Sequence, residues 1–310
     1  MPDSPNRPRP YDAARDKSTP RFIRFFRLTR LLLHLLYGCF YVGVLFPFFS
    51  RHRRFRAIRR WARQMLSMLR LRVEVRGSLP AGEAPTLIVS NHVSWLDIWV
   101  VNAVVPVRFV AKSDIRRWPV VGFLVSNAGT IFIERQKKQD TFRTNRAIVQ
   151  ALTRGEHVAI FPEGMTTDGT EVKPFHASLF QPALGAGARV VVTALRYVNR
   201  DGSANLDAAY AGDRSLWESV WLILAQPVLE AELIFAATID VRAKTRREIA
   251  REAEVLTADA LRLPRPDRRT GTAGDPQAAA PTASSPTNNL YPAQSHPARE
   301  PDPTLTSVRR

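Results

Sequence analysis

The sequence has little cysteine and no grouped metal ligands. Cys39 is the only cysteine among 310 residues, which excludes a disulfide within the chain and any cysteine-based metal cluster. The six histidines are scattered, and none has a partner at the spacing of a metal site. The P-loop pattern (GxxxxGK followed by Ser or Thr) is absent, which argues against a nucleoside triphosphatase. We therefore expect no metal and no cofactor.

Acidic residues are scarce in the first quarter of the chain. Residues 1–72 hold 17 Arg and Lys but only 3 Asp and Glu, so about +14 of the formal net charge of +17 lies there. The remainder is close to neutral. Nucleic-acid-binding proteins more often spread basic charge over a folded body, so we expect no nucleic-acid partner.

The basic charge instead surrounds one apolar run, Leu31–Phe49, which has 19 residues and no formal charge. As a helix it would be about 28 Å long, close to the hydrocarbon thickness of a bilayer. Arginines flank it on both sides and suit anionic headgroups. A signal peptide fits poorly, because polar residues precede the run and no small-residue cleavage site follows it. A membrane span, a re-entrant hairpin and a buried helix of a soluble core all stay open.

Residues 52–70 predict a basic amphipathic helix. Apolar residues recur there at helical spacing between arginines: Phe55, Ile58, Trp61, Met65 and Met68. This pattern is typical of a helix lying on a membrane surface. The alternative is a helix packed on the folded domain.

The composition divides the chain into four parts. Residues 1–20 are polar and Pro-rich, and we expect them to be disordered. Residues 21–70 are the expected membrane-associated helices, and 71–263 are the expected globular domain. Residues 264–310 contain nine prolines and almost no large apolar residues, which predicts a disordered tail.

Strands alternate with helices from residue 71 onward, which predicts an α/β domain with a largely parallel sheet flanked by helices. The expected strands are 71–76, 86–90, 107–111, 130–134, 157–162, 189–197 and 228–236. The expected helices are 94–102, 113–127 with a break near Pro119, 140–154, 177–187, 216–225 and 243–261. The alternating pattern of 228–236 favours an edge strand.

The run "IVSNHVSWLDIWV" places His92 and Asp97 in an otherwise apolar stretch, where a strand ends and a helix begins. Sites in open α/β sheets form at such strand ends. His92 can act as a general base, and Asp97 can hold its other ring nitrogen and stabilise the imidazolium. The alternative is structural, because Ser94-x-x-Asp97 is also a capping-box pattern.

Two further strand ends carry polar groups. "GTIFIER" ends in Arg135, whose guanidinium matches phosphate oxygens. "FPEGMTTDGT" supplies Glu163, and its Gly164 and the Thr166 hydroxyl suit a tight turn against a ligand.

In this order and at these separations, "NHVSWLD", "GTIFIER" and "FPEG" resemble the motif set of the glycerophospholipid acyltransferase superfamily, in particular its bacterial 1-acylglycerol-3-phosphate acyltransferases. "VAKSDIRRWPVVGFL" resembles the segment after the first motif. The resemblance covers roughly residues 71–200. Met165 stands where the family usually has Ser or Thr, and Thr193 stands where the fourth motif usually has Pro, which leaves the acceptor open.

The resemblance implies a role for each matching residue. His92 takes the proton from the acceptor hydroxyl, and Asp97 supports His92. The other implied residues bind or position substrate: Arg135 on the acceptor phosphate, Glu163 and Gly164 on the acceptor, Lys112 as an anionic contact, and Thr166 in place of the motif's hydroxyl. No serine lies in a nucleophile elbow, so direct attack by the substrate hydroxyl is favoured over an acyl-enzyme.

The resemblance therefore implies a membrane enzyme of phospholipid biosynthesis. It would move a fatty acyl group from acyl-CoA or acyl-carrier protein to a lysophospholipid, making phosphatidic acid. Because both donors are cytoplasmic, we expect the active site on the cytoplasmic face of the bacterial inner membrane. The alternatives are another acceptor such as a lyso-ornithine lipid, for which "KPFHASLFQPAL" is a pointer, and a non-catalytic lipid-binding protein.

Overall fold

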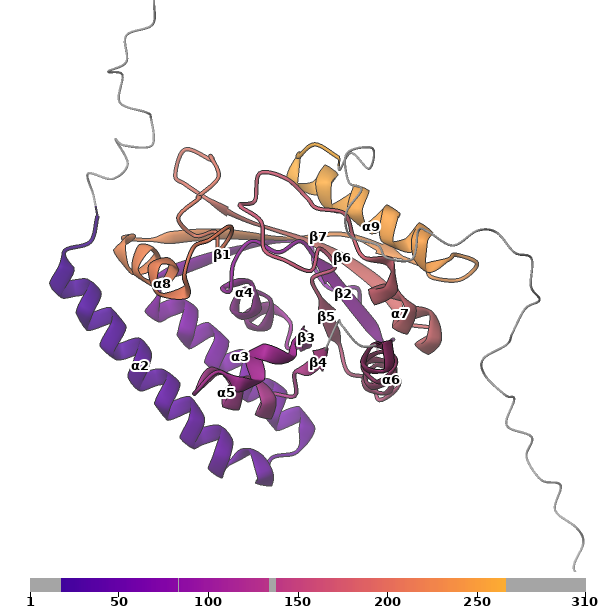
Figure 1. Cartoon of the computed structure of the whole chain (residues 1–310), viewed down its shortest axis with the longest axis horizontal. Coiled ribbons are helices and arrows are strands. Elements are labelled where there is room, and N and C mark those ends of the chain that lie inside the picture. Colours follow the sequence, from indigo (N-terminus) through magenta and orange to yellow (C-terminus); the bar gives the residue numbers. More distant parts are fainter. Residues whose placement is uncertain (1–17, 83, 134–137, 266–310) are drawn as a thin grey trace, which may run out of the picture. The chain divides into compact units, whose positions relative to one another are not determined.

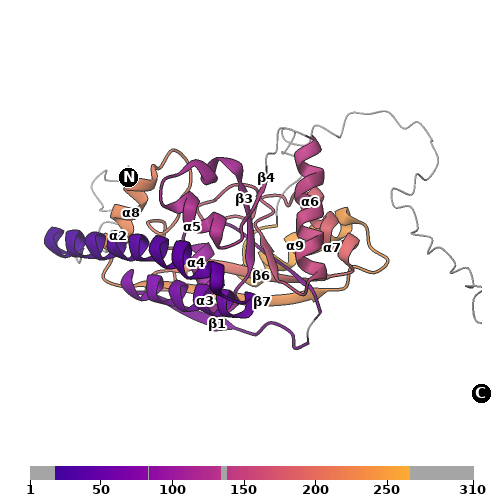
Figure 2. The ribbon, with the colours of Figure 1, turned by 90° about the horizontal axis from the view of Figure 1, so that it is seen from below.

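A computed structural model describes residues 18–82, 84–133 and 138–265 (Figure 1). The expected terminal disordered segments lie almost wholly outside these residues, and Arg135 lies outside them as well. Figure 1 labels the α-helices and strands used below, and Figure 2 shows the same ribbon turned by 90°.

A seven-stranded sheet forms the centre of the fold, in the order β1-β7-β6-β2-β5-β3-β4. Strands β6, β2, β5, β3 and β4 are parallel, and β7 is antiparallel to β6 but parallel to β1. The strands are β1 (Leu71–Arg76), β2 (Thr86–Ser90), β3 (Arg108–Lys112), β4 (Ile131–Ile133), β5 (Val158–Ile160), β6 (Arg189–Val198) and β7 (Leu229–Ile239). The predicted α/β class with a largely parallel sheet is confirmed.

Helices cover both faces of the sheet. The α-helices are α2 (Arg21–Val44), α3 (Arg51–Met68), α4 (Asp97–Val104), α5 (Val121–Asn127), α6 (Lys138–Thr153), α7 (Gln181–Ala186), α8 (Leu216–Ala225) and α9 (Arg246–Leu261). The 3-10 helices are η2 (Phe46–Phe48), η3 (Ser113–Arg117) and η4 (Ala177–Phe180). The expected break near Pro119 separates η3 from α5, where Val120 has a positive φ of 62°.

Two hydrophobic cores form because successive strand side chains point to opposite faces. Leu87 and Val89 of β2 pack with α6, α7 and α9, whereas Ile88 packs with α3, α4 and α8. All three side chains are buried, which explains why the centre of β2 is apolar on both faces. Figures 1 and 2 show these two helix groups on opposite sides of the sheet.

The prediction that residues 228–236 form an edge strand is wrong. β7 lies between β1 and β6, and the edges of the sheet are β1 and β4. The alternating pattern arises because one face of β7 is only half-buried. Alternation reports how each face is covered, whereas an edge depends on hydrogen-bonding neighbours.

Helix α3 packs on the folded domain, which was the alternative to a surface-bound helix. Its apolar side buries Ala62, Met65 and Leu66 against the core that contains α4. Arg59 and Arg63 donate to the carbonyl of Ala103, at 3.3 and 3.0 Å, near the carboxyl end of α4. Cations are favourable at a helix carboxyl end, so part of the basic charge stabilises the fold itself.

Helix α2 has one buried side and one exposed apolar side. Leu31, Gly38 and Val42 lie on the buried side, against α3 and α5. The exposed side carries large apolar residues along its whole length: Phe22, Phe25, Phe26, Leu32, Leu33, Leu36, Tyr37, Phe40 and Val44. By length and composition the helix could cross a membrane, and 28% of its apolar window is buried. The exposed apolar side does not fit the alternative of a helix buried in a soluble core.

Candidate active site

The candidate site begins where β2 ends and β6 continues beyond it. Ser90 pairs with Thr193, and β6 extends five residues further, to Val198. The Asn91 side chain takes the place of the missing strand. Its Nδ2 donates to the Leu195 carbonyl at 2.9 Å, and its Oδ1 accepts from the Leu195 N–H at 2.8 Å. The chain can therefore turn out of the sheet at Asn91 while the buried backbone N–H and carbonyl of Leu195 keep hydrogen-bond partners.

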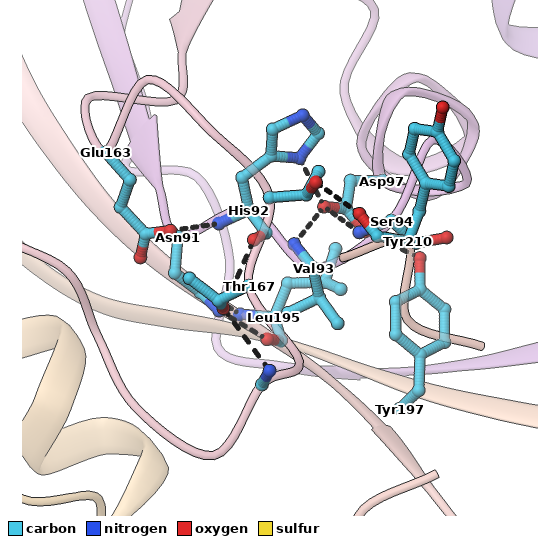
Figure 3. A network of polar contacts seen from close by, with 12 residues as sticks. Asn91, His92, Val93, Ser94, Asp97, Glu163, Thr167, Leu195, Tyr197 and Tyr210 are labelled. Carbon is cyan, nitrogen blue, oxygen red and sulfur yellow. Dashed lines mark hydrogen bonds and ion pairs between the residues drawn. The ribbon is translucent and has the colours of Figure 1, made fainter. Parts of the chain in front are cut away.

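His92 and Asp97 form a close pair at this strand end (Figure 3). His92 Nδ1 lies 2.7 Å from Asp97 Oδ2, and Asp97 is fully buried at the first position of α4. The same oxygen accepts the N–H groups of Val93 and Ser94, at 2.8 and 3.0 Å. Oδ1 accepts the Tyr197 hydroxyl at 2.7 Å. These donors fix the carboxylate and offset its burial.

The capping-box alternative accounts for only part of this geometry. Asp97 does accept the Ser94 N–H, as a capping box requires. The reciprocal bond is missing, since the buried Ser94 hydroxyl has no partner among the described residues. Asp97 therefore both orders the start of α4 and binds His92. Because Asp97 uses the Val93 and Ser94 N–H groups, these are not free to bind a substrate oxyanion.

The His92 ring is held flat against a strand-end phenylalanine. It stacks on Phe161 with a centroid separation of 4.0 Å and an interplanar angle of 6°. The side chain is 20% exposed, and Nδ1 is the nitrogen that faces Asp97. Figure 3 shows the other ring nitrogen directed away from the carboxylate. Nε2 is therefore the nitrogen that can exchange a proton with a bound molecule.

The loop after β5 holds the His92 backbone from two sides. The Thr167 N–H donates to the His92 carbonyl at 2.8 Å. Glu163 Oε2 accepts the His92 N–H in a long hydrogen bond of 3.4 Å. The loop after β5 therefore holds the His92 backbone through one side-chain contact and one backbone contact.

Glu163 is a buried, neutral carboxyl group. It is 4% exposed, and burial, with a smaller contribution from the charge of Asp97, raises its pKa to about 9. Its Oε1 has no hydrogen-bond partner among the described residues. An ionised carboxylate in this position would be costly, so the carboxyl is protonated at neutral pH.

The other residues predicted from the sequence lie at separate points around the pair. Gly164 has φ +77° in the turn after Glu163, a conformation that favours glycine. The Thr166 hydroxyl donates to the Tyr210 carbonyl. Lys112 is exposed at the end of β3 and makes no described hydrogen bond with His92 or Asp97. Arg135 lies outside the described residues.

Thr193, the departure from the fourth motif, lies inside the sheet. It is 1% exposed, and its hydroxyl donates to the Val89 carbonyl at 3.1 Å. The register between β6 and β7 shifts between Val192 and Thr193. The extra residue of this bulge is Ala236 in β7, and Thr193 stays paired with Ser90.

The sequence did not point to three residues of the site. They are Tyr197, which bonds Asp97; Asn91, whose side chain pairs with the Leu195 backbone; and Phe161, on which the His92 ring stacks. The available signal for Tyr197 was its place on the same face of β6 as Thr193 and Leu195. Among the described residues, no group of three His, Cys, Asp or Glu side chains is arranged to hold a metal ion.

The fold and the site define an α/β acyltransferase, and comparison with known proteins agrees. The sequence profile of the family described as Acyltransferase matches residues 70–196. The crystal structure of the 1-acyl-sn-glycerophosphate acyltransferase PlsC from Thermotoga maritima has the same fold, with a TM-score of 0.54 and 20% identity. The match covers 76% of this chain and 96% of that one.

Curated relatives identify the family. A 1-acyl-sn-glycerol-3-phosphate acyltransferase of Neisseria meningitidis serogroup B is 40% identical over 60% of this chain and 72% of its own length. A lyso-ornithine lipid O-acyltransferase of Pseudomonas aeruginosa is 35% identical over 66% of this chain and 78% of its own length. The chain belongs to the glycerophospholipid acyltransferase family, and it is an acyltransferase.

Proposed function

We propose that this chain transfers a fatty acyl group from an acyl thioester to the free hydroxyl of 1-acylglycerol-3-phosphate, making phosphatidic acid. The observation that carries the proposal is the buried, fully hydrogen-bonded Asp97 at 2.7 Å from the partly exposed His92. This pair lies inside the segment that matches the family. The donor is acyl-CoA or acyl-carrier protein.

His92 acts as a general base in the proposed reaction. Nε2 takes the proton of the acceptor hydroxyl while its oxygen attacks the thioester carbonyl. The tetrahedral intermediate collapses, the C–S bond breaks, and the thiolate receives the proton from the imidazolium. Asp97 stabilises the imidazolium through Nδ1. Glu163 and Thr167 hold the histidine backbone, and Arg135, Lys112, Gly164 and Thr166 contribute to the acceptor site.

A second acceptor, lyso-ornithine lipid, is favoured by the Pseudomonas aeruginosa relative and by the segment "KPFHASLFQPAL". The test supplies purified protein with one acyl-CoA and, in parallel, with lysophosphatidic acid and lyso-ornithine lipid. The proposal expects a kcat/KM at least tenfold higher for lysophosphatidic acid. The reverse order would assign the enzyme to ornithine-lipid synthesis. No thioester consumption with either acceptor would favour a non-catalytic lipid-binding protein.

The membrane contact is proposed to run along α2. Near one end, Arg27 donates to the carbonyls of Leu224 and Gln226, at 3.2 and 2.8 Å, and near the other Val42 packs with Leu124. The helix is therefore fastened to the domain over most of its length. A perpendicular crossing would carry the domain into the bilayer, so we propose that α2 lies in the membrane plane on the cytoplasmic face, with its exposed apolar side in lipid.

The aromatic side of α8 continues this surface. Trp217 is 60% exposed. The ring centroids of Trp221 and Phe25 are 5.4 Å apart, and the Arg24 guanidinium lies over the Trp221 ring. Tryptophan and arginine both suit the headgroup region. Replacing Leu33, Leu36 and Phe40 by serine should release the protein from washed membranes, whereas high salt alone should not. Phe142→Ser, an exposed apolar residue on α6, is the matched control. Release of the unaltered protein by salt would contradict insertion.

A further inference from the structure

Tyr197 lies outside the three sequence motifs, yet it reaches the centre of the site. It is 3% exposed, near the end of β6, in the part of the strand that extends beyond β2. Leu195, two residues earlier, is held by Asn91. This contact fixes the strand just before Tyr197 and aims the phenol at the start of α4 (Figure 3).

The two oxygens of Asp97 have different partners. Oδ2 is shared by the His92 ring and by the N–H groups of Val93 and Ser94. Oδ1 is bound by the Tyr197 hydroxyl at 2.7 Å, and no other described residue donates to it. Tyr197 is therefore the one described side chain, besides His92, that holds the carboxylate.

The phenol stays a hydrogen-bond donor throughout the working pH range. Burial, and then the charge of Asp97, raises the pKa of Tyr197 well above its ordinary value. A fixed donor on Oδ1 draws negative charge away from Oδ2, the oxygen that stabilises the imidazolium. It also prevents rotation of the carboxylate, because Oδ1 has a defined partner on the far side.

We propose that Tyr197 is a positioning residue that sets the basicity of His92 through Asp97. The proposal rests on the proposed general-base role of His92. Removing the Tyr197 hydroxyl takes a hydrogen bond from the Asp97 carboxylate. The carboxylate then stabilises the His92 imidazolium more strongly, so His92 becomes a stronger base. The other titratable groups on the facing loop after β5 are Glu163, which bonds the His92 backbone, Asp168, which accepts from Thr170, the Glu171–Lys173 pair, and His176.

The test is Tyr197→Phe in the full chain, with the pH dependence of kcat/KM measured for the acyl-CoA donor. We expect the acid limb of the profile to move up by about one pH unit, and kcat on the plateau to fall by about tenfold. The KM values of both substrates should stay unchanged. Tyr41→Phe, which removes a phenol hydroxyl on α2 from the apolar cluster of Val42, Phe46 and Leu124, should leave the profile where it is.

A second substitution keeps the test decisive if Tyr197→Phe folds poorly. A fluorinated tyrosine introduced at position 197 keeps the shape of the ring and makes the hydroxyl a stronger donor. The acid limb should then move to lower pH, opposite to the shift in Tyr197→Phe. The effect of Tyr197→Phe should also disappear in an Asp97→Asn background, because the residue acts through Asp97.

The outcomes separate this inference from the function on which it rests. Opposite shifts in the two variants support the inference. A folded Tyr197→Phe with an unmoved acid limb overturns it, as does a fluorinated protein whose limb does not move. Full activity of His92→Ala would instead overturn the proposed general base, whatever the Tyr197 variants show.

Discussion

Glu163 should make the stability of the folded chain depend on pH in an unusual direction. Its pKa is about 9 in the folded protein, against an ordinary value of 4.5. Between these two values the folded state holds a proton that the unfolded state lacks. The free energy of unfolding therefore falls as pH rises, by up to about 1.4 kcal/mol per pH unit. From pH 6 to pH 8 this amounts to about 3 kcal/mol.

Glu163→Gln removes the titration and keeps an oxygen that can accept the His92 N–H. Urea unfolding in detergent, followed by circular dichroism at pH 6 and pH 8, compares the two proteins. The free energy of unfolding of Glu163→Gln, relative to that of the unaltered protein, should rise with pH. The rise between pH 6 and pH 8 should approach about 3 kcal/mol. Glu171→Gln, an exposed carboxylate on the same loop, is the matched control and should change the pH dependence only slightly, because its charge makes the smallest of the contributions that raise the pKa of Glu163. Parallel curves for Glu163→Gln and the unaltered protein would refute the neutral carboxyl.

Substitutions at Asp97 and Arg135 and a deletion at the carboxyl end of the chain test three separate points. Asp97→Asn should lower kcat by roughly 10²–10⁴-fold, measured as thiol release, because the imidazolium loses its partner; loss of less than tenfold would contradict this. Arg135→Ala should raise the KM of the acceptor much more than that of the donor, and Arg135→Lys should restore only part of the loss; a change confined to the donor would move Arg135 to the donor site. Deleting residues 267–310 should leave the thermal midpoint and the activity unchanged, because this composition buries little apolar surface; a large fall in the midpoint would contradict it.

Local signals in the sequence predicted most elements of the fold. The apolar centre of β2, the break at Pro119 and the strand–helix alternation each report a short-range property, and each has its counterpart in the structure. The position of β7 was not predictable in this way. It depends on which strands pair over more than a hundred residues of sequence, as β1 with β7, and no local pattern encodes this.

In the site, too, residues close in sequence were predictable and a residue distant in sequence was not. His92 and Asp97 are five positions apart, so one turn at the start of α4 brings them together, and their spacing alone suggested the pair. Tyr197 is one hundred positions from Asp97 and reaches it only because β6 extends beyond the end of β2. The apolar side of α3 is a similar case, since an amphipathic pattern predicts an apolar face but not whether lipid or α4 covers it.

The most direct test of the central claim is the rate of thiol release by purified His92→Ala, with acyl-CoA and lysophosphatidic acid, in a variant whose thermal midpoint matches the unaltered protein. General-base catalysis by His92 predicts a loss of about 10²–10⁴-fold, equivalent to roughly 3–5 kcal/mol of activation free energy. A folded His92→Ala that keeps more than about a tenth of the original rate would contradict the assignment of His92 as the general base.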